Sequence, residues 1–231
     1  MTAARSTEAI VARLARDLAP VRPIAPLHRQ AIAIAGAWAA SAAVAAGWIG
    51  LHPLVTLARG AISTSLLVAL AVIGAAGLVL GLACRVPGRE RLALAAGIGA
   101  GFGAIALAAV GIALPGPIAD AATVVQGEAC SERSLVLAIP SALLAASLGL
   151  RGAPWRPRIA GVSLAVGAAA LGGLLVHASC PSPSPAHWLT SHALLPLAVG
   201  AAAGWLVAGY FDRRAQSARQ TLVRALNAEL L

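Results

Sequence analysis

Charge is scarce in this chain, and lysine is missing altogether. Only 11% of the 231 residues are charged, whereas 59% are hydrophobic. A soluble globular domain carries about 25% charged residues, and disordered chains are also rich in charged and polar residues. The composition therefore excludes both classes and indicates an integral membrane protein.

Cysteine is also rare, and the common catalytic motifs are missing. Three cysteines in so long a chain exclude a disulfide-rich scaffold. No zincin, nucleophile-elbow or P-loop pattern occurs. The long apolar segments contain no Asp, Glu, Arg or Lys, although such a residue is the usual mark of an ion pathway. We expect neither an enzyme nor a cofactor, and a small-solute transporter or exporter stays as the alternative function.

Six long segments free of charge organise the chain. A helix needs about 20 apolar residues to cross the hydrocarbon core, and an open strand cannot cross it because its backbone groups stay unpaired. We therefore predict an all-α fold, with a transmembrane bundle over 31–210, a cytoplasmic arm over 1–30 and a cytoplasmic tail over 211–231. The segments are Ala31–Gly50, Ile62–Ala83, Leu92–Leu114, Ser134–Leu150, Ile159–Ala178 and Thr190–Tyr210, the fourth being short and containing Pro140.

The arginines are distributed unevenly between the two sides of this bundle. The arm, the second and fourth connections and the tail hold 15 of the 17, and only Arg59 and Arg133 lie in the other three connections. Cytoplasmic loops carry such an excess, so the pattern predicts a bacterial inner-membrane protein with both termini cytoplasmic. The connections 51–61, 115–133 and 179–189 then face outward. The net charge of +9 is explained by topology, and we expect no direct nucleic-acid partner.

Glycines recur one helical turn apart within the predicted spans. Such pairs let helix backbones approach closely inside a lipid bilayer. We expect them to pack helices within one subunit, with a homo-oligomer face as the alternative. The pairs are Gly77 and Gly81, Gly97 and Gly101, Gly99 and Gly103, and Gly200 and Gly204.

The predicted topology separates the three cysteines. Cys84 lies at the cytoplasmic end of the second span, whereas Cys130 and Cys180 lie in outward connections. Disulfides persist in an oxidising envelope, and a bond closing a loop of about 50 residues contributes about 4 kcal/mol. A structural disulfide, a redox- or metal-responsive pair and a chance placement all remain open from these residues.

Three histidines lie close to Cys180 in the sequence. His177, His187 and His192 could join thiolates as ligands of a soft or borderline metal ion. Their spacing is not that of a standard zinc motif. We therefore expect histidines in polar surroundings at the membrane interface, and no permanent metal site.

The N-terminal arm contains one short amphipathic segment. Its apolar residues recur at helical spacing, and prolines at 20, 23 and 26 end the segment. An isolated helix of about 13 residues is marginal in water, so its apolar stripe needs a protein groove or a membrane surface. The stripe is Ile10, Leu14, Leu18 and Val21, with Arg13 and Arg16 on the other faces.

Several stretches, in chain order, resemble the NrsF-type proteins, which are six-span bacterial inner-membrane anti-sigma factors. The most specific is the His-x-x-Cys-Pro stretch after the fifth span, combined with one upstream outer cysteine. The stretches are Ile10–Val21, Gly127–Cys130, Arg151–Pro154 and His177–Pro181, with Ser184, Pro185 and His187.

The resemblance implies a role for each part. The arm would sequester an extracytoplasmic-function sigma factor, with its apolar stripe as anchor and Arg13 and Arg16 paired with acidic residues. Cys130 and Cys180 would sense oxidative or heavy-metal stress, and the sigma factor would then be released. The family often has acidic residues after the Cys-Pro pair, where this chain has Ser182-Pro183-Ser184. That difference argues against metal binding by this loop more than it argues against redox chemistry.

Overall fold

The computed structural model describes residues 25–50, 60–114, 121–149 and 156–230, and this part of the chain is helical without a strand. The proposed arm residues Ile10, Arg13, Leu14, Arg16, Leu18 and Val21 lie outside the described residues. The elements are α2 Leu27–Trp48, α4 Ala61–Ala83, α5 Glu90–Ala113, α6 Ala121–Gly149, α7 Pro157–His177, α8 Pro185–His187, the π-helix η1 Trp188–Leu194 and α9 Leu195–Leu230.

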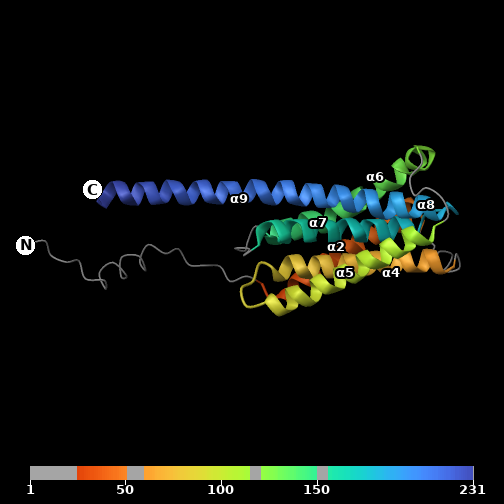
Figure 1. Ribbon diagram of the computed structural model, residues 1–231, viewed down its shortest axis with the longest axis horizontal. Helices are drawn as coiled ribbons and strands as arrows, with labels where there is room; N and C mark the ends of the chain where they lie inside the picture. The colour runs from red at the N-terminus through yellow and green to blue at the C-terminus, as the bar shows by residue number, and fades with distance from the viewer. Residues whose placement is uncertain (1–24, 51–59, 115–120, 150–155, 231) are drawn as a thin grey trace, which may run out of the picture.

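Six helical segments in the described residues are long and apolar enough to cross a membrane. The predicted all-α bundle of six spans is therefore confirmed. Figure 1 shows the helices side by side, with the C-terminal end of α9 at one end and α8 at the other. We call these the terminal end and the cysteine end of the bundle.

Helix α7 is the centre of the bundle and packs against α4, α6 and α9. Small residues allow this packing. A Cβ added to Gly77 of α4 would lie 2.8 Å from the Ser163 carbonyl oxygen, and one added to Gly204 of α9 would lie 2.6 Å from the Gly161 carbonyl oxygen. These glycines pack helices within one subunit, as predicted from their spacing.

One glycine pair does not behave as predicted. A Cβ added to Gly97 or Gly101 would meet nothing within 4 Å, because this face of α5 points away from the bundle. Phe102 and Ile105, also on α5, are 68% and 66% exposed. The prediction that this pair packs within the subunit is wrong. Gly103 does pack, against Ile73 of α4.

The spans that form the cysteine end begin earlier than predicted. The fourth membrane-length helix covers Gly127–Leu148, and the sixth covers Pro185–Tyr210. Cys130 therefore lies within α6 rather than in a connection, and Glu128, Glu132 and Arg133 belong to the same helix. Defining spans as segments free of charged residues placed the start of this span too late. The three charged side chains are exposed at the helix end, where Arg133 stacks 5.7 Å from the Trp48 ring.

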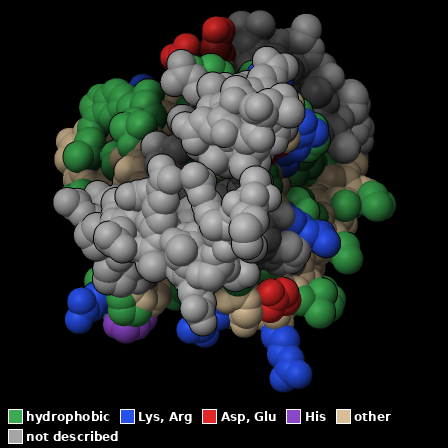
Figure 2. All heavy atoms as spheres, turned by 90° about the vertical axis from the view of Figure 1, so that its left-hand side faces the viewer, with side chains coloured by type: hydrophobic (Ala, Val, Ile, Leu, Met, Phe, Trp, Pro, Cys, Tyr) green, Lys and Arg blue, Asp and Glu red, His purple; other side chains and the backbone are tan. Residues whose placement is uncertain are grey.

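Helix α9 continues without interruption into the predicted tail. Its 36 residues would measure about 54 Å at the α-helical rise, and Figure 1 shows it extending beyond the bundle at the terminal end. Figure 2 looks onto that end, where arginine side chains stand around the rim. Arg29, Arg89, Arg91, Arg156, Arg158 and Arg213 are exposed, whereas Arg85 is buried.

Candidate thiol and imidazole site

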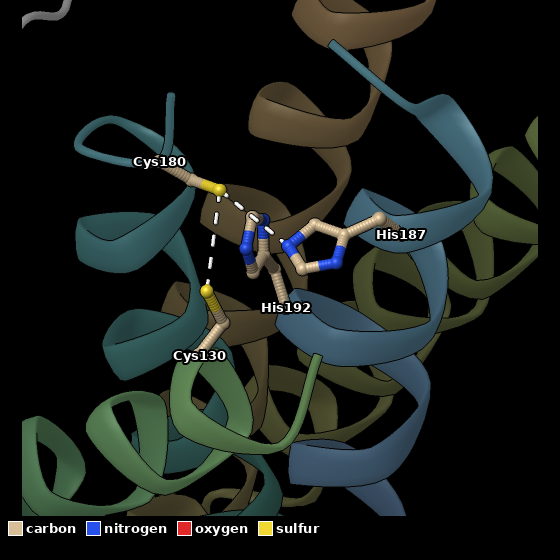
Figure 3. A group of neighbouring side chains, drawn as sticks. All are labelled: Cys130, Cys180, His187 and His192. Atoms are coloured by element: carbon tan, nitrogen blue, oxygen red, sulfur yellow. Dashed lines mark hydrogen bonds between the residues drawn. The ribbon is translucent and has the colours of Figure 1, made fainter. Parts of the chain in front are cut away.

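Two cysteines and two histidines meet inside the cysteine end of the bundle. The Sγ atoms of Cys130 and Cys180 are 4.0 Å apart, and Cys180 Sγ is 3.5 Å from His187 Nε2. With His192, the four residues each offer one donor atom, and all four atoms lie within 4.8 Å of one another. Figure 3 shows the four side chains converging from α6, the segment after α7, α8 and η1. We call them the donor cluster.

Cys180 and His187 are brought together by a tight return of the chain after α7. The Cys180 backbone N–H donates to the Val176 carbonyl, which wraps the chain over the end of α7. Ser184 then accepts a hydrogen bond from the His187 N–H and Pro185 occupies the first turn, so a new helix begins there. The Trp188 indole N–H donates to the Ser182 carbonyl and fixes the return from the other side.

The π-helix η1 explains how His187 and His192 come to face the same thiols. In an α-helix, residues five apart lie on different faces, because 3.6 residues complete a turn. A π-helix forms i→i+5 hydrogen bonds, so residues five apart lie one turn apart. The two imidazole centroids are accordingly 5.2 Å apart. Short π-helices occur frequently at functional sites.

Pro196 accounts for where the π-helix ends. The Leu195 N–H still donates to the Thr190 carbonyl five residues earlier, but the next residue is Pro196, which has no N–H. The Ser191 carbonyl therefore lacks its helical donor. Ser131 of α6 replaces it, with its hydroxyl 3.1 Å from the Ser191 oxygen and equally far from the Gly127 carbonyl of its own helix. This contact joins α6 to η1 next to Cys130.

Three glycines make room for these close contacts. A side chain at Gly127 would collide with Ser191, one at Gly172 with the Ser134 carbonyl, and one at Gly173 with the His192 carbonyl. Because two of the three obstacles are backbone atoms, no rotamer change could relieve them. Gly127 therefore sets the distance between α6 and η1, and Gly172 and Gly173 set the distances of these two elements from α7.

A second layer of hydrogen bonds orients His192. The Nε2 atom of the fully buried His177 lies 3.1 Å from the backbone carbonyl of Ser63 and 3.0 Å from its hydroxyl, and its Nδ1 lies 3.2 Å from His192 Nδ1. A carbonyl can only accept, so His177 Nε2 carries the proton and its Nδ1 accepts from His192. This arrangement leaves the Nε2 lone pair of His192 for the donor cluster. Metal-binding histidines are typically oriented through their other ring nitrogen in this way.

Two distances within the donor cluster are close to those between ligands of a tetrahedral metal site. Zinc binds thiolate at about 2.3 Å and imidazole at about 2.0–2.1 Å, which places tetrahedral ligands about 3.8 Å apart for two sulfurs and about 3.6 Å for sulfur and nitrogen. The observed distances of 4.0 and 3.5 Å match both values. The same two thiols are also neighbours that an oxidant could join.

Hydrogen bonding favours the thiolate at Cys180. Its pKa lies below the ordinary value because the Cys130 thiol hydrogen-bonds its sulfur, although burial opposes this effect. By contrast, burial raises the pKa of Cys84, which lies at the other end of the bundle. Thiolate is the form that binds metals and attacks oxidants.

The structure thus brings together the two cysteines that the sequence singled out, and it adds two histidines that the sequence did not assign to a site. The sequence led us to expect interfacial histidines in polar surroundings; the structure buries them, with His177 and His192 fully buried and His187 6% exposed. The sequence spacing of the histidines does not match a zinc motif, because His187 and His192 come together only through a π-helix. The nearest signal in the sequence is Pro196, five residues after Ser191.

Replacing Gly173 with alanine should push η1 away from α7. The added methyl group meets the His192 carbonyl, and overpacking of this kind costs on the order of 1–3 kcal/mol. Thermal unfolding followed by circular dichroism should show the loss of stability, and Cd²⁺ binding should weaken. Gly101→Ala is the matched control, because its methyl group would enter open space. Equal behaviour of the two variants would contradict the packing argument.

The fold and this site define a six-helix bundle of membrane-spanning length with a buried thiol and imidazole cluster at one end. A profile of the NrsF family, described as negative regulator of sigma F, matches residues 14–213. The chain belongs to the NrsF family and is a negative regulator of a sigma factor. No curated protein and no solved structure matches it.

Proposed function

We propose that this protein is an inner-membrane anti-sigma factor that holds an extracytoplasmic-function sigma factor through its N-terminal arm. A signal outside the cytoplasm that reaches Cys130 and Cys180 releases the sigma factor. The observation that supports this assignment most directly is the family match, which covers residues 14–213 and so includes the second half of the arm. The protein acts by binding, without a catalytic step.

The arginine distribution supports the orientation. Six described arginines are exposed around the terminal end, and positively charged residues are retained on the cytoplasmic side. The arm is then cytoplasmic, where a sigma factor is found. The donor cluster is at the opposite end, facing the periplasm.

The donor set supports a soft metal ion as the signal at this cluster. Two thiols and two imidazoles form the type of ligand set that soft and borderline metals prefer. The ligands besides Cys130 and Cys180 are His187 and His192, so the lack of acidic residues after Pro181 does not weaken the site. An oxidant is the other signal: two thiols would form one S–S bond and give up two protons and two electrons to it.

A comparison of partners bound with and without the arm tests the function. The full chain and a chain lacking residues 1–25 are purified from native membranes in mild detergent, and bound proteins are identified by mass spectrometry. A sigma factor should be retained by the full chain alone. If neither version retains one, the anti-sigma proposal fails, and solute uptake into proteoliposomes becomes the next measurement.

A further inference from the structure

An apolar groove lies near the terminal end between α6, α7 and α9. Its cavity volume is about 290 Å³, and its walls are mostly small or aliphatic residues, including Ala142 and Ala146 of α6, Gly161 of α7 and Ala203 of α9. On its flanks, Leu143 of α6 and Leu206 of α9 are 66% and 67% exposed. Large apolar side chains of this kind at a membrane-spanning surface face acyl chains.

Among the described residues that line this groove, Arg85 alone has a polar side chain. It follows α4 and is only 5% exposed. Its Nη2 donates to the Ala145 carbonyl at 2.8 Å, whereas its Nη1 has no hydrogen-bond partner among the described residues. Burial lowers the pKa of Arg85 to about 10, so the guanidinium is charged at neutral pH.

A buried guanidinium with unused donors is unfavourable unless an anion accepts from it. The described residues supply no carboxylate to Arg85. A phosphate oxygen suits a guanidinium especially well, because both can form paired hydrogen bonds. Arg156 and Arg158, on either side of the groove residue Pro157, are exposed and add positive charge at the rim.

We propose that this groove binds one anionic phospholipid, with its phosphate on Arg85 and an acyl chain along the apolar walls. The two parts of the site match the two parts of such a lipid. The charged part lies at the bundle end where lipid headgroups are found, and the apolar part opens sideways between helices. Basic pockets between membrane helices bind anionic headgroups in this manner. The site is distinct from the donor cluster and is independent of the proposed function.

Lipid competition measured by native mass spectrometry tests the site on the full chain. The probes are phosphatidylglycerol and phosphatidylcholine with identical acyl chains. The wild type should retain one phosphatidylglycerol at a lipid concentration about tenfold lower than it needs for phosphatidylcholine. Arg85→Gln should remove this preference, and Arg89→Gln, which changes an exposed arginine of the same connection, should keep it.

A second variant separates binding from folding. Ala146→Phe leaves Arg85 in place and changes an exposed groove residue. The fold is therefore retained, while the phenyl ring fills the space that the acyl chain would occupy. It should also abolish the preference for phosphatidylglycerol. Excess inorganic phosphate should not displace the lipid. Wild-type preference in either the Arg85 or the Ala146 variant, or displacement of the lipid by phosphate, would overturn the proposal.

Discussion

Replacing Leu14 with glutamate is expected to free the sigma factor and to raise transcription from its promoters about tenfold or more without any inducing signal. Leu14 lies in the middle of the apolar stripe of the arm. If the stripe fills a groove of the sigma factor, a carboxylate there is buried without a partner, and a cost of a few kcal/mol weakens binding about 100-fold. A promoter reporter in cells and the affinity of the purified pair measure the effect.

Ala12→Glu is the matched control for this change. It introduces the same charge into the same segment, but residue 12 lies on the opposite face from the stripe at helical spacing. Binding and transcription should stay near wild type. If both variants release the sigma factor, charge rather than the stripe governs binding. If neither does, the arm is not the binding element.

Removal of the donor cluster is expected to abolish both metal binding and the response to metal. The purified protein should bind one Zn²⁺ or Cd²⁺ per chain, and Cys180→Ser or His192→Ala should weaken binding on the order of 100-fold or more. Titration with Cd²⁺, followed by the thiolate charge-transfer absorbance, measures the affinity. In cells, the Cys180 variant should no longer respond to cadmium.

Two further variants separate a metal site from a merely structural cluster. His177→Phe removes the group that orients His192 without removing a ligand, and affinity should fall about 10- to 100-fold. Cys84→Ser changes the cysteine at the other end of the bundle and should bind metal as the wild type does. Wild-type affinity in the Cys180 variant would exclude this metal site. A response to oxidant but not to metal would instead indicate disulfide formation.

The spans were predictable from sequence because membrane crossing imposes a simple demand on length and composition. Cys130 and Cys180 were also predictable as neighbours on one side, since topology places both there. The histidines were not, because the pairing of His187 with His192 depends on a π-helix. The spacing rules for metal ligands assume ordinary helices and loops.

Arg85 illustrates a second limit of sequence reasoning. It counts as one of many arginines that set the orientation, and nothing in its neighbours distinguishes it from Arg89 or Arg91. Only the packing shows that Arg85 is buried under α6 while the other two are exposed. Burial of a single residue in a charged connection depends on the shape of the groove above it, which local composition does not encode.

The π-helix also has a mechanical consequence for the far end of the molecule. Each residue of offset between a π-helical and an α-helical register corresponds to roughly 100° of rotation about the helix axis. The π-helix η1 continues directly into the 36 residues of α9. If the winding at His192 changed from π-helical to α-helical by one residue, the whole of α9 would rotate about its axis by that angle. A local change in helical winding beside the thiols would thus rotate the C-terminal segment without bending any helix. A different side of that segment would then face its surroundings.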